Sequence, residues 1–191
     1  MILETIITTR NEDGGVHLAP MGMHDRDGQL VLAPFRPSRS LDNLLRERTA
    51  VINCTDDVRV FAGCLTGRRT WPTLPAAQIA GARLADALSH TEVSVENIED
   101  DPVRPRLLCR TLHSAIHRPF RGFNRAQSAV IEAAILVSRL HMLSPEKVDA
   151  EVAYLTIGVE KTAGAHEREA WEWLMDAIRA HRTGSSREAS V

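Results

Sequence analysis

The stretch ETIITTRNEDGG (residues 4–15), with the HLAPMG that follows it (residues 17–22), decides the fold that this sequence predicts. The first stretch opens with Ile and Thr, which favour a strand, and closes with NEDGG, whose Asn, Asp and Gly residues suit a tight turn. HLAPMG lies in the return strand, expected from Val16 to Met23. A third strand from Gln29 to Phe35 then completes an antiparallel meander.

HLAPMG also carries the first binding hypothesis. A proline and a glycine late in a strand disturb its pairing, so backbone groups there can turn towards a ligand. The residues concerned are Ala19, Pro20, Met21 and Gly22. Gly22, which lacks a Cβ, would let a flat ring approach closely. The alternative is an edge strand that ends in a bulge.

A second candidate is FRPSRSLDN (residues 35–43), which leads into a short helix expected from Leu41 to Glu47 with Ser40 as its N-cap. Guanidinium groups, hydroxyls and a helix N-terminus together favour a phosphate. These groups belong to Arg36, Ser38, Arg39 and Ser40. The alternative is an exposed basic loop with an ordinary serine cap.

A third candidate is RPFRGFNR (residues 118–125), at the start of a helix that Asn124 caps. It gathers arginines, including Arg125, beside two phenylalanines. The segment would bind an anion or pack across a subunit interface. The alternative is a solvated loop whose phenylalanines plug the core.

The rest of the chain reads as strands followed by helices, an order typical of the α+β class. Strands are expected at residues 50–54, 58–65, 91–98 and 107–116, and helices at 78–88, at 124–143, and in two segments from Pro145 to Arg182. The strand at 107–116 also fits a helical row of apolar residues.

Composition excludes several classes of protein. The 23 basic and 25 acidic residues give a net charge of -2, so we expect no nucleic-acid partner. No apolar run approaches the ~20 residues of a membrane span. The start of the chain lacks a basic leader, and three cysteines make no disulfide framework, so we expect a cytoplasmic protein.

Catalytic and metal-ligating patterns are not evident in the sequence. His113 and His117, if they lie on a strand, are ~13 Å apart at ~3.3 Å per residue, too far for one ion. We therefore expect no metal site, and no catalytic side chain can be named.

Three stretches together resemble the flavin reductase-like FMN-binding split barrels. They are ETIITTRNEDGG with HLAPMG, FRPSRSLDNLLRERTAVINCTDD (residues 35–57), and RPFRGFNRAQSAVIEAAI (residues 118–135). The likeness is greatest to a domain-of-unknown-function family found in methanogens and methylotrophs.

This resemblance implies a mainly β, six-stranded antiparallel split barrel at residues 1–123 and a C-terminal helical region packed on it at 124–182. A flexible tail would follow at 183–191. It also implies a homodimer with FMN near the subunit interface.

The resemblance assigns roles to the candidate residues as well. The strand at residues 19–22 would line the isoalloxazine, the segment at 36–40 would meet the phosphate, and Asn53 would lie near the flavin. Arg125 is a further candidate from the third stretch.

The implied function is that of an FMN-dependent oxidoreductase acting on a small molecule, with an electron donor such as a nicotinamide. The family's occurrence suggests a link to tetrahydromethanopterin-dependent one-carbon metabolism. The alternative is a non-catalytic flavin-binding or accessory protein, because a flavin supplies its own redox chemistry and the sequence names no catalytic residue.

Overall fold

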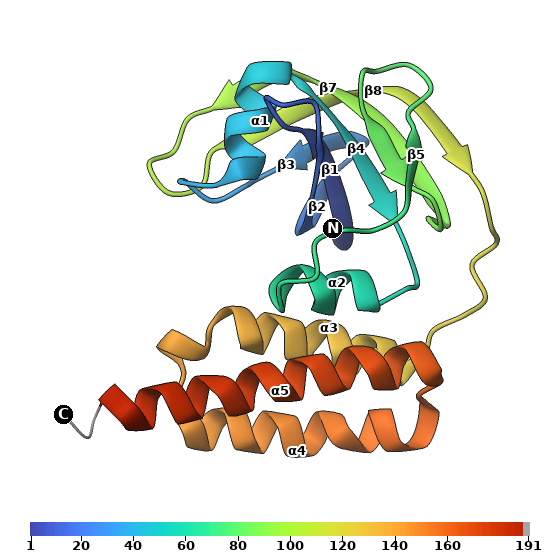
Figure 1. The fold of residues 1–191 in the computed structure, drawn as a ribbon. Coiled ribbons are helices and arrows are strands. Elements are labelled where there is room, and N and C mark those ends of the chain that lie inside the picture. Colours follow the sequence, from blue (N-terminus) through green and yellow to red (C-terminus); the bar gives the residue numbers. More distant parts are fainter. Residues whose placement is uncertain (189–191) are drawn as a thin grey trace. The chain divides into compact units, whose positions relative to one another are not determined.

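Residues 1–188 are described by the structure, a computed structural model, and they belong to two units (Figure 1). The first unit comprises Met1–Asp56 and Arg69–Phe120, and the second comprises Asp57–Arg68 and the chain from Arg121 onward. The first unit holds all of the strands, and the second is helical.

Six antiparallel strands close the first unit into a barrel in the order β1-β2-β3-β8-β7-β4. Their bounds are β1 Ile2–Arg10, β2 Val16–Arg26, β3 Gln29–Leu32, β4 Thr49–Cys54, β7 Ser89–Glu99 and β8 Arg106–Ile116. The predicted meander is confirmed, since β1, β2 and β3 are neighbours in this order. The expected α+β fold, a six-stranded barrel followed by helices, is confirmed as well.

The barrel core follows from strand alternation, which sends every second side chain inward. Ile7 of β1, Ile52 of β4 and Val93 of β7 meet there in one buried cluster with Leu107 of β8. Residues between these positions point to the outer face, where several are nonetheless buried, among them Asn53 and Glu92.

Strand β2 is paired over most of its length on one side, and only near its end on the other. β1 pairs with residues 16–24 of β2, whereas β3 pairs with Met23–Arg26 alone. Within the described residues, no strand pairs with the other edge of β2 from Val16 to Gly22. Pro20, which has no N–H to donate, suits such an edge.

A two-stranded excursion, β5 (Thr73–Pro75) with β6 (Ala82–Leu84), lies where a helix was predicted at residues 78–88, so that prediction is wrong. Tertiary hydrogen bonds determine this segment. The amides of residues 77, 78 and 79 donate to the carboxylate of Glu92, and the amide of Leu84 donates to Asn53 Oδ1. A buried polar group that must be satisfied here overrides local helix propensity.

As far as residue 188, the second unit has four α-helices, of which α3, α4 and α5 run side by side in Figure 1. Their bounds are α2 Arg59–Leu65, α3 Arg125–Ser138, α4 Pro145–Thr162 and α5 Ala165–Glu188, with a 3₁₀ turn at Leu140–Met142. Asn124 and Ser144 cap α3 and α4 as predicted. None of the helices described in residues 1–188 is long and apolar enough to cross a membrane.

Helix α2 corrects the prediction of a strand at residues 58–65. A short apolar run does not distinguish a strand from a buried helix by periodicity alone. As a helix, the segment packs Val58 and Ala62 against Val130 of α3 and Leu174 of α5. The barrel domain predicted at residues 1–123 therefore contains a helix that belongs to the second unit.

Two predicted helix ends also differ from the structure. α3 ends at Ser138 rather than near Leu143, and α5 continues to Glu188 rather than stopping near Arg182. The predicted flexible tail at 183–191 is thus helical as far as 188, and residues 189–191 lie outside the described part of the chain.

Helix α1 (Arg39–Glu47) begins earlier than predicted. Its N-cap is Ser38, whose hydroxyl accepts from the Leu41 amide at 3.2 Å. Ser40, the predicted cap, lies inside the first turn and is buried. Two serines in alternate positions both fit the cap pattern, and only the backbone conformation of residue 38 decides between them.

Candidate functional site

The edge of β2 that no described strand covers and the start of α1 adjoin each other, which brings the first two sequence candidates together. His17 of β2 and Ser40 of α1 make the link, with 3.1 Å between the imidazole Nε2 and the serine Oγ. Backbone groups on the β2 edge and amides in the first turn of α1 therefore lie in one region. A ligand with a polar ring and an anionic group could use both.

The four predicted residues of β2 divide between the two faces of the strand. Met21 belongs to the barrel core, and alternation puts Ala19 on the same inner face. Pro20 and Gly22 point to the outer face. A Cβ on Gly22 would lie 2.9 Å from Ile2 Cγ2, so the missing side chain permits close packing of Ile2 against the strand. Any ligand contact by Ala19 or Met21 would use backbone atoms.

The arginines of the second candidate differ in their surroundings. Arg36 donates to Asp100 Oδ1 at 2.8 Å, so an acidic partner already accompanies its charge. Arg39 is exposed at the first position of α1. Ser38 is engaged as the N-cap, as described above.

His17 lies near two positively charged side chains. Burial first, and then the nearby charges of Arg39 and Arg69, lower the pKa of His17 below its ordinary value. The imidazole is therefore neutral at pH 7, with two guanidiniums close to it. Arg69, exposed at the start of the excursion, joins the set although sequence reasoning gave it no role.

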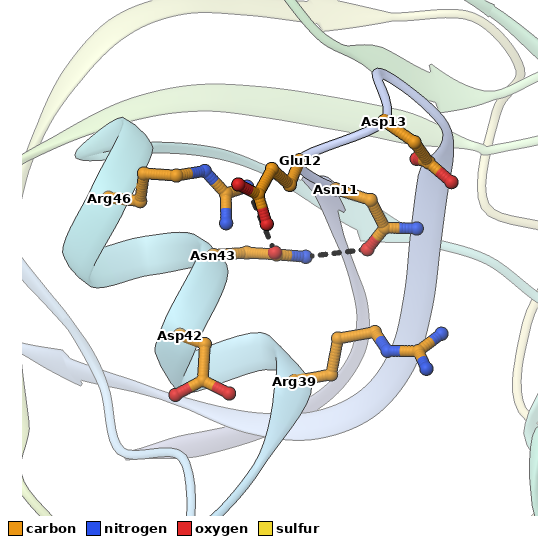
Figure 2. A pocket seen from close by; sticks show the side chains of 7 residues that line it. All are labelled: Asn11, Glu12, Asp13, Arg39, Asp42, Asn43 and Arg46. Carbon is orange, nitrogen blue, oxygen red and sulfur yellow. Dashed lines mark hydrogen bonds between the residues drawn. The ribbon is translucent and has the colours of Figure 1, made fainter.

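An open cavity of about 610 Å³ lies between the β1–β2 turn and α1, and Arg39 is one of the residues that line it (Figure 2). Its lining consists of Asn11, Glu12, Asp13, Arg39, Asp42, Asn43 and Arg46. Asn43 joins the turn to the helix by donating to Asn11 Oδ1 at 2.9 Å and to Thr9 Oγ1 at 3.0 Å. Three carboxylates against two guanidiniums make this lining a poor match for a phosphate dianion.

Asn53 is buried and bonded to protein on both sides of its amide. Its nitrogen donates to Ile6 O at 2.9 Å, and its oxygen accepts from the Leu84 amide at 2.8 Å. These bonds tie β4 to β1 and to the excursion. A role of Asn53 towards a flavin, which stays a prediction, would therefore be one of positioning.

The third candidate belongs only partly to the barrel. Arg118 pairs with Asp56 in the first unit, whereas Arg125 is the first residue of α3 in the second. Arg125 lines a cavity of about 210 Å³ between α3 and α4, together with Tyr154. Phe120 and Phe123 are exposed, so they do not plug the core as the alternative interpretation required.

Sequence reasoning missed His17 and Arg69 as members of this region. His17 opens the HLAPMG stretch that was singled out, but strand alternation puts it on the same face as Ala19 and Met21, and its contact with Ser40 of α1 depends on the fold. Arg69 follows α2, and no local pattern connects it to β2.

Family models match both parts of the chain. Residues 3–118 match the N-terminal domain of the family described as protein of unknown function (DUF447), and residues 124–176 match the second model of the same family. No curated protein sequence is significantly similar to the chain.

Solved structures share the fold. An FMN-bound protein of this family from Methanosarcina mazei superposes with a TM-score of 0.80 at 18% identity, over 92% of this chain and 94% of that chain. The 2-nitrobenzoate 2-nitroreductase of Pseudomonas fluorescens reaches 0.52 at 18% identity, over 60% and 64%. The styrene monooxygenase flavin reductase of Pseudomonas putida reaches 0.51 at 14% identity, over 61% and 80%. The barrel thus has the split-barrel fold of flavin reductases.

We predict that Asn53→Ala lowers the free energy of unfolding by ~2 kcal/mol or more. The substitution leaves the buried Ile6 carbonyl and Leu84 amide without their partner, at ~1–3 kcal/mol for each group. Chemical denaturation measures the effect. Asn97→Ala, at an exposed position of β7, is the matched control and should change the free energy of unfolding by less than ~0.5 kcal/mol. Equal stability of the two variants would contradict the anchoring role.

Proposed function

The chain belongs to the DUF447 family, whose split-barrel fold it has, and from this premise we propose that it binds FMN along the edge of β2 that no described strand covers and acts as an oxidoreductase on a small molecule. The observation that carries the proposal is the meeting of this edge with the start of α1. There Arg39, Ser40 and His17 form a polar, cationic corner.

The residues present fit FMN in two respects. At the edge of β2 that no described strand covers, backbone N–H and C=O groups can face the polar rim of an isoalloxazine. The first turn of α1, with Arg39 and Arg69 nearby, offers a favourable place for a phosphate. The family member from Methanosarcina mazei, with the same fold over nearly all of its length, is FMN-bound, which supports this choice of cofactor.

The protein's own contribution would be to hold and orient the cofactor. FMN, when bound, supplies the electron transfer itself. His17, held neutral by burial and by the arginines, would lie beside the phosphate end and keep Ser40 oriented. The substrate is a small molecule, and the electron donor a nicotinamide nucleotide. None of the neighbours bears on a link to tetrahydromethanopterin-dependent one-carbon metabolism, which stays a prediction.

We also propose a homodimer. A cofactor along an exposed strand edge needs a partner surface to exclude water from the ring. The first unit exposes large apolar side chains, among them Phe35, Ile116 and Phe120, which a second copy would cover. Sedimentation velocity should give twice the mass of the 191-residue chain at micromolar concentration. A monomer mass that does not change with concentration would refute the dimer.

The function is tested by one titration and one assay. The fluorescence of added FMN should decrease when FMN binds. In the presence of an electron acceptor, the complex should then oxidise NADH or NADPH steadily. Absence of binding at micromolar FMN would refute the proposal. Bound flavin that accepts no electrons from either donor would favour a non-catalytic flavin-binding protein instead. This alternative is motivated by the sequence, in which no group of catalytic side chains can be named.

We predict that Arg39→Ala weakens FMN binding about tenfold to a hundredfold. A charge-assisted contact is worth ~1.5–3 kcal/mol, and 1.4 kcal/mol corresponds to a factor of ten. Riboflavin, which lacks the phosphate, should bind both forms equally.

The matched control is Arg36→Ala. This arginine lies three residues before Arg39, in the loop that leads into α1, but is already paired with Asp100, so its loss should weaken FMN binding less than about threefold. A larger loss in Arg36→Ala than in Arg39→Ala would move the phosphate to the other end of the loop.

A further inference from the structure

Two histidines and a glutamate meet on the outer face of the barrel, on strands β7 and β8. One ligating atom from each of His90, Glu92 and His113 lies within 4.8 Å of the others. The fold explains the meeting. His90 and Glu92 are two residues apart on β7 and face away from the core residue Val93, while His113 is the β8 residue directly opposite Glu92.

The pairing of β7 with β8 is irregular at this point. The register shifts between Glu92 and Val93, so that β8 carries an extra residue, Leu112, next to His113. Bulges of this kind re-aim side chains and are frequent beside functional sites. His113 is tilted by 53° to His90, with 5.6 Å between the ring centroids.

The carboxylate of Glu92 is held by hydrogen bonds from backbone amides. Its side chain is completely buried, yet its carboxylate accepts from the amides of Ala77 at 2.5 Å, Gln78 at 2.7 Å and Ile79 at 3.1 Å. Burial alone would raise the pKa of Glu92, but these hydrogen bonds, with that of His90, outweigh it and lower the pKa. Three backbone amides thus hold the carboxylate of Glu92 in place on the outer face of the barrel.

His90 lies between this carboxylate and another histidine. Its Nε2 is 3.2 Å from Glu92 Oε1, and its Nδ1 is 2.8 Å from Nε2 of His117. The backbone of His117 is itself held, since its amide donates to Leu88 O at 2.7 Å. If the His90 Nδ1–H donates to His117, the lone pair of Nε2 points at Glu92. A cation could then take the place of the proton between Nε2 and Oε1.

We propose that His90 Nε2, Glu92 Oε1 and one ring nitrogen of His113 bind a divalent first-row transition metal ion of the Zn²⁺ type. Metal–ligand bonds of ~2.0–2.2 Å at tetrahedral angles separate two ligand atoms by ~3.3–3.5 Å. The His90–Glu92 pair, at 3.2 Å, is already close to this spacing. His113 closes the rest by a side-chain rotation.

The chemistry of this three-residue set suits such an ion. Two imidazoles and one carboxylate form a combination used by zinc and by non-haem iron sites, and it leaves coordination positions open. His113 is half-exposed and its ring nitrogens make no hydrogen bond among the residues the structure describes, so it gives access from solvent. His117 would fix the orientation of His90, as outer partners of metal-bound histidines do.

The sequence argued against a metal at His113 and His117 because of their separation along one strand. That argument placed both histidines on one strand; β8 includes His113 but ends at Ile116, one residue before His117. The neighbouring strand changes the outcome, because it places His90 opposite Ala115, between the two. His113 thus reaches the Glu92 side of the His90 ring, and His117 reaches the other.

Zinc titration of the chelator-treated full chain tests the proposal. Calorimetry should show one Zn²⁺ per chain, and Co²⁺ should give the visible absorption of a tetrahedral or five-coordinate site. His113→Asn should weaken binding by at least tenfold without loss of fold, because this residue is partly exposed. His166→Asn, an exposed histidine on α5, is the matched control and should leave affinity unchanged.

Two outcomes would overturn the site. One is the absence of saturable binding of either ion up to ~1 mM. The other is equal affinity in the wild type and His113→Asn, which would leave His90 and Glu92 as an anchor for the excursion only. Glu92→Gln, expected to weaken binding ten- to a hundredfold, is interpreted only if circular dichroism shows it folded. FMN is absent from the titration, so failure here leaves the flavin proposal untouched.

Discussion

Polar side chains buried on the outer face of the barrel must find partners in the protein, and this constraint shapes much of the first unit. Thr8, Asn53 and Glu92 all bond to the segment from residue 77 to 84. Without that segment, a carboxylate and an amide would face either water or an apolar cover. The excursion thus has little regular structure of its own and is held in place by the strands beneath it. The same polar layer carries the His90 and His113 side chains.

Local patterns were sufficient for the parts of the fold that local forces determine. NEDGG predicts the turn of the β1–β2 hairpin, and Asn124 and Ser144 predict the starts of α3 and α4 because their side chains can cap a helix. Residues 58–65 and 78–88 were mispredicted for the opposite reason. One is a short apolar run whose partners, α3 and α5, lie far along the chain, and the other is bonded to side chains of β4 and β7.

The candidate site shows the same division. The start of α1 and the β2 edge were identified from their residues, because capping and proline placement are local. The state of Arg36 was not, since its partner Asp100 is 64 positions away. Strand pairing brings His90 and His113 together, and a register shift at Leu112 sets the direction of His113. Neither follows from spacing within one strand.

The structural neighbours separate two levels of likeness. Reductases such as those of the two Pseudomonas species match only about 60% of the chain, whereas the Methanosarcina mazei protein matches 92%. Helix α2 adds a topological consequence to this difference. The chain leaves the barrel after Asp56, contributes residues 57–68 to the helical unit, and returns at Arg69. Removal of everything after Phe120 would remove the helices that bury Val58 and Ala62 of α2. The apolar side chains of α2 would then be exposed in the middle of the remaining chain. The C-terminal helices are therefore not an independent appendage, because their core includes a segment that is encoded between two strands of the barrel.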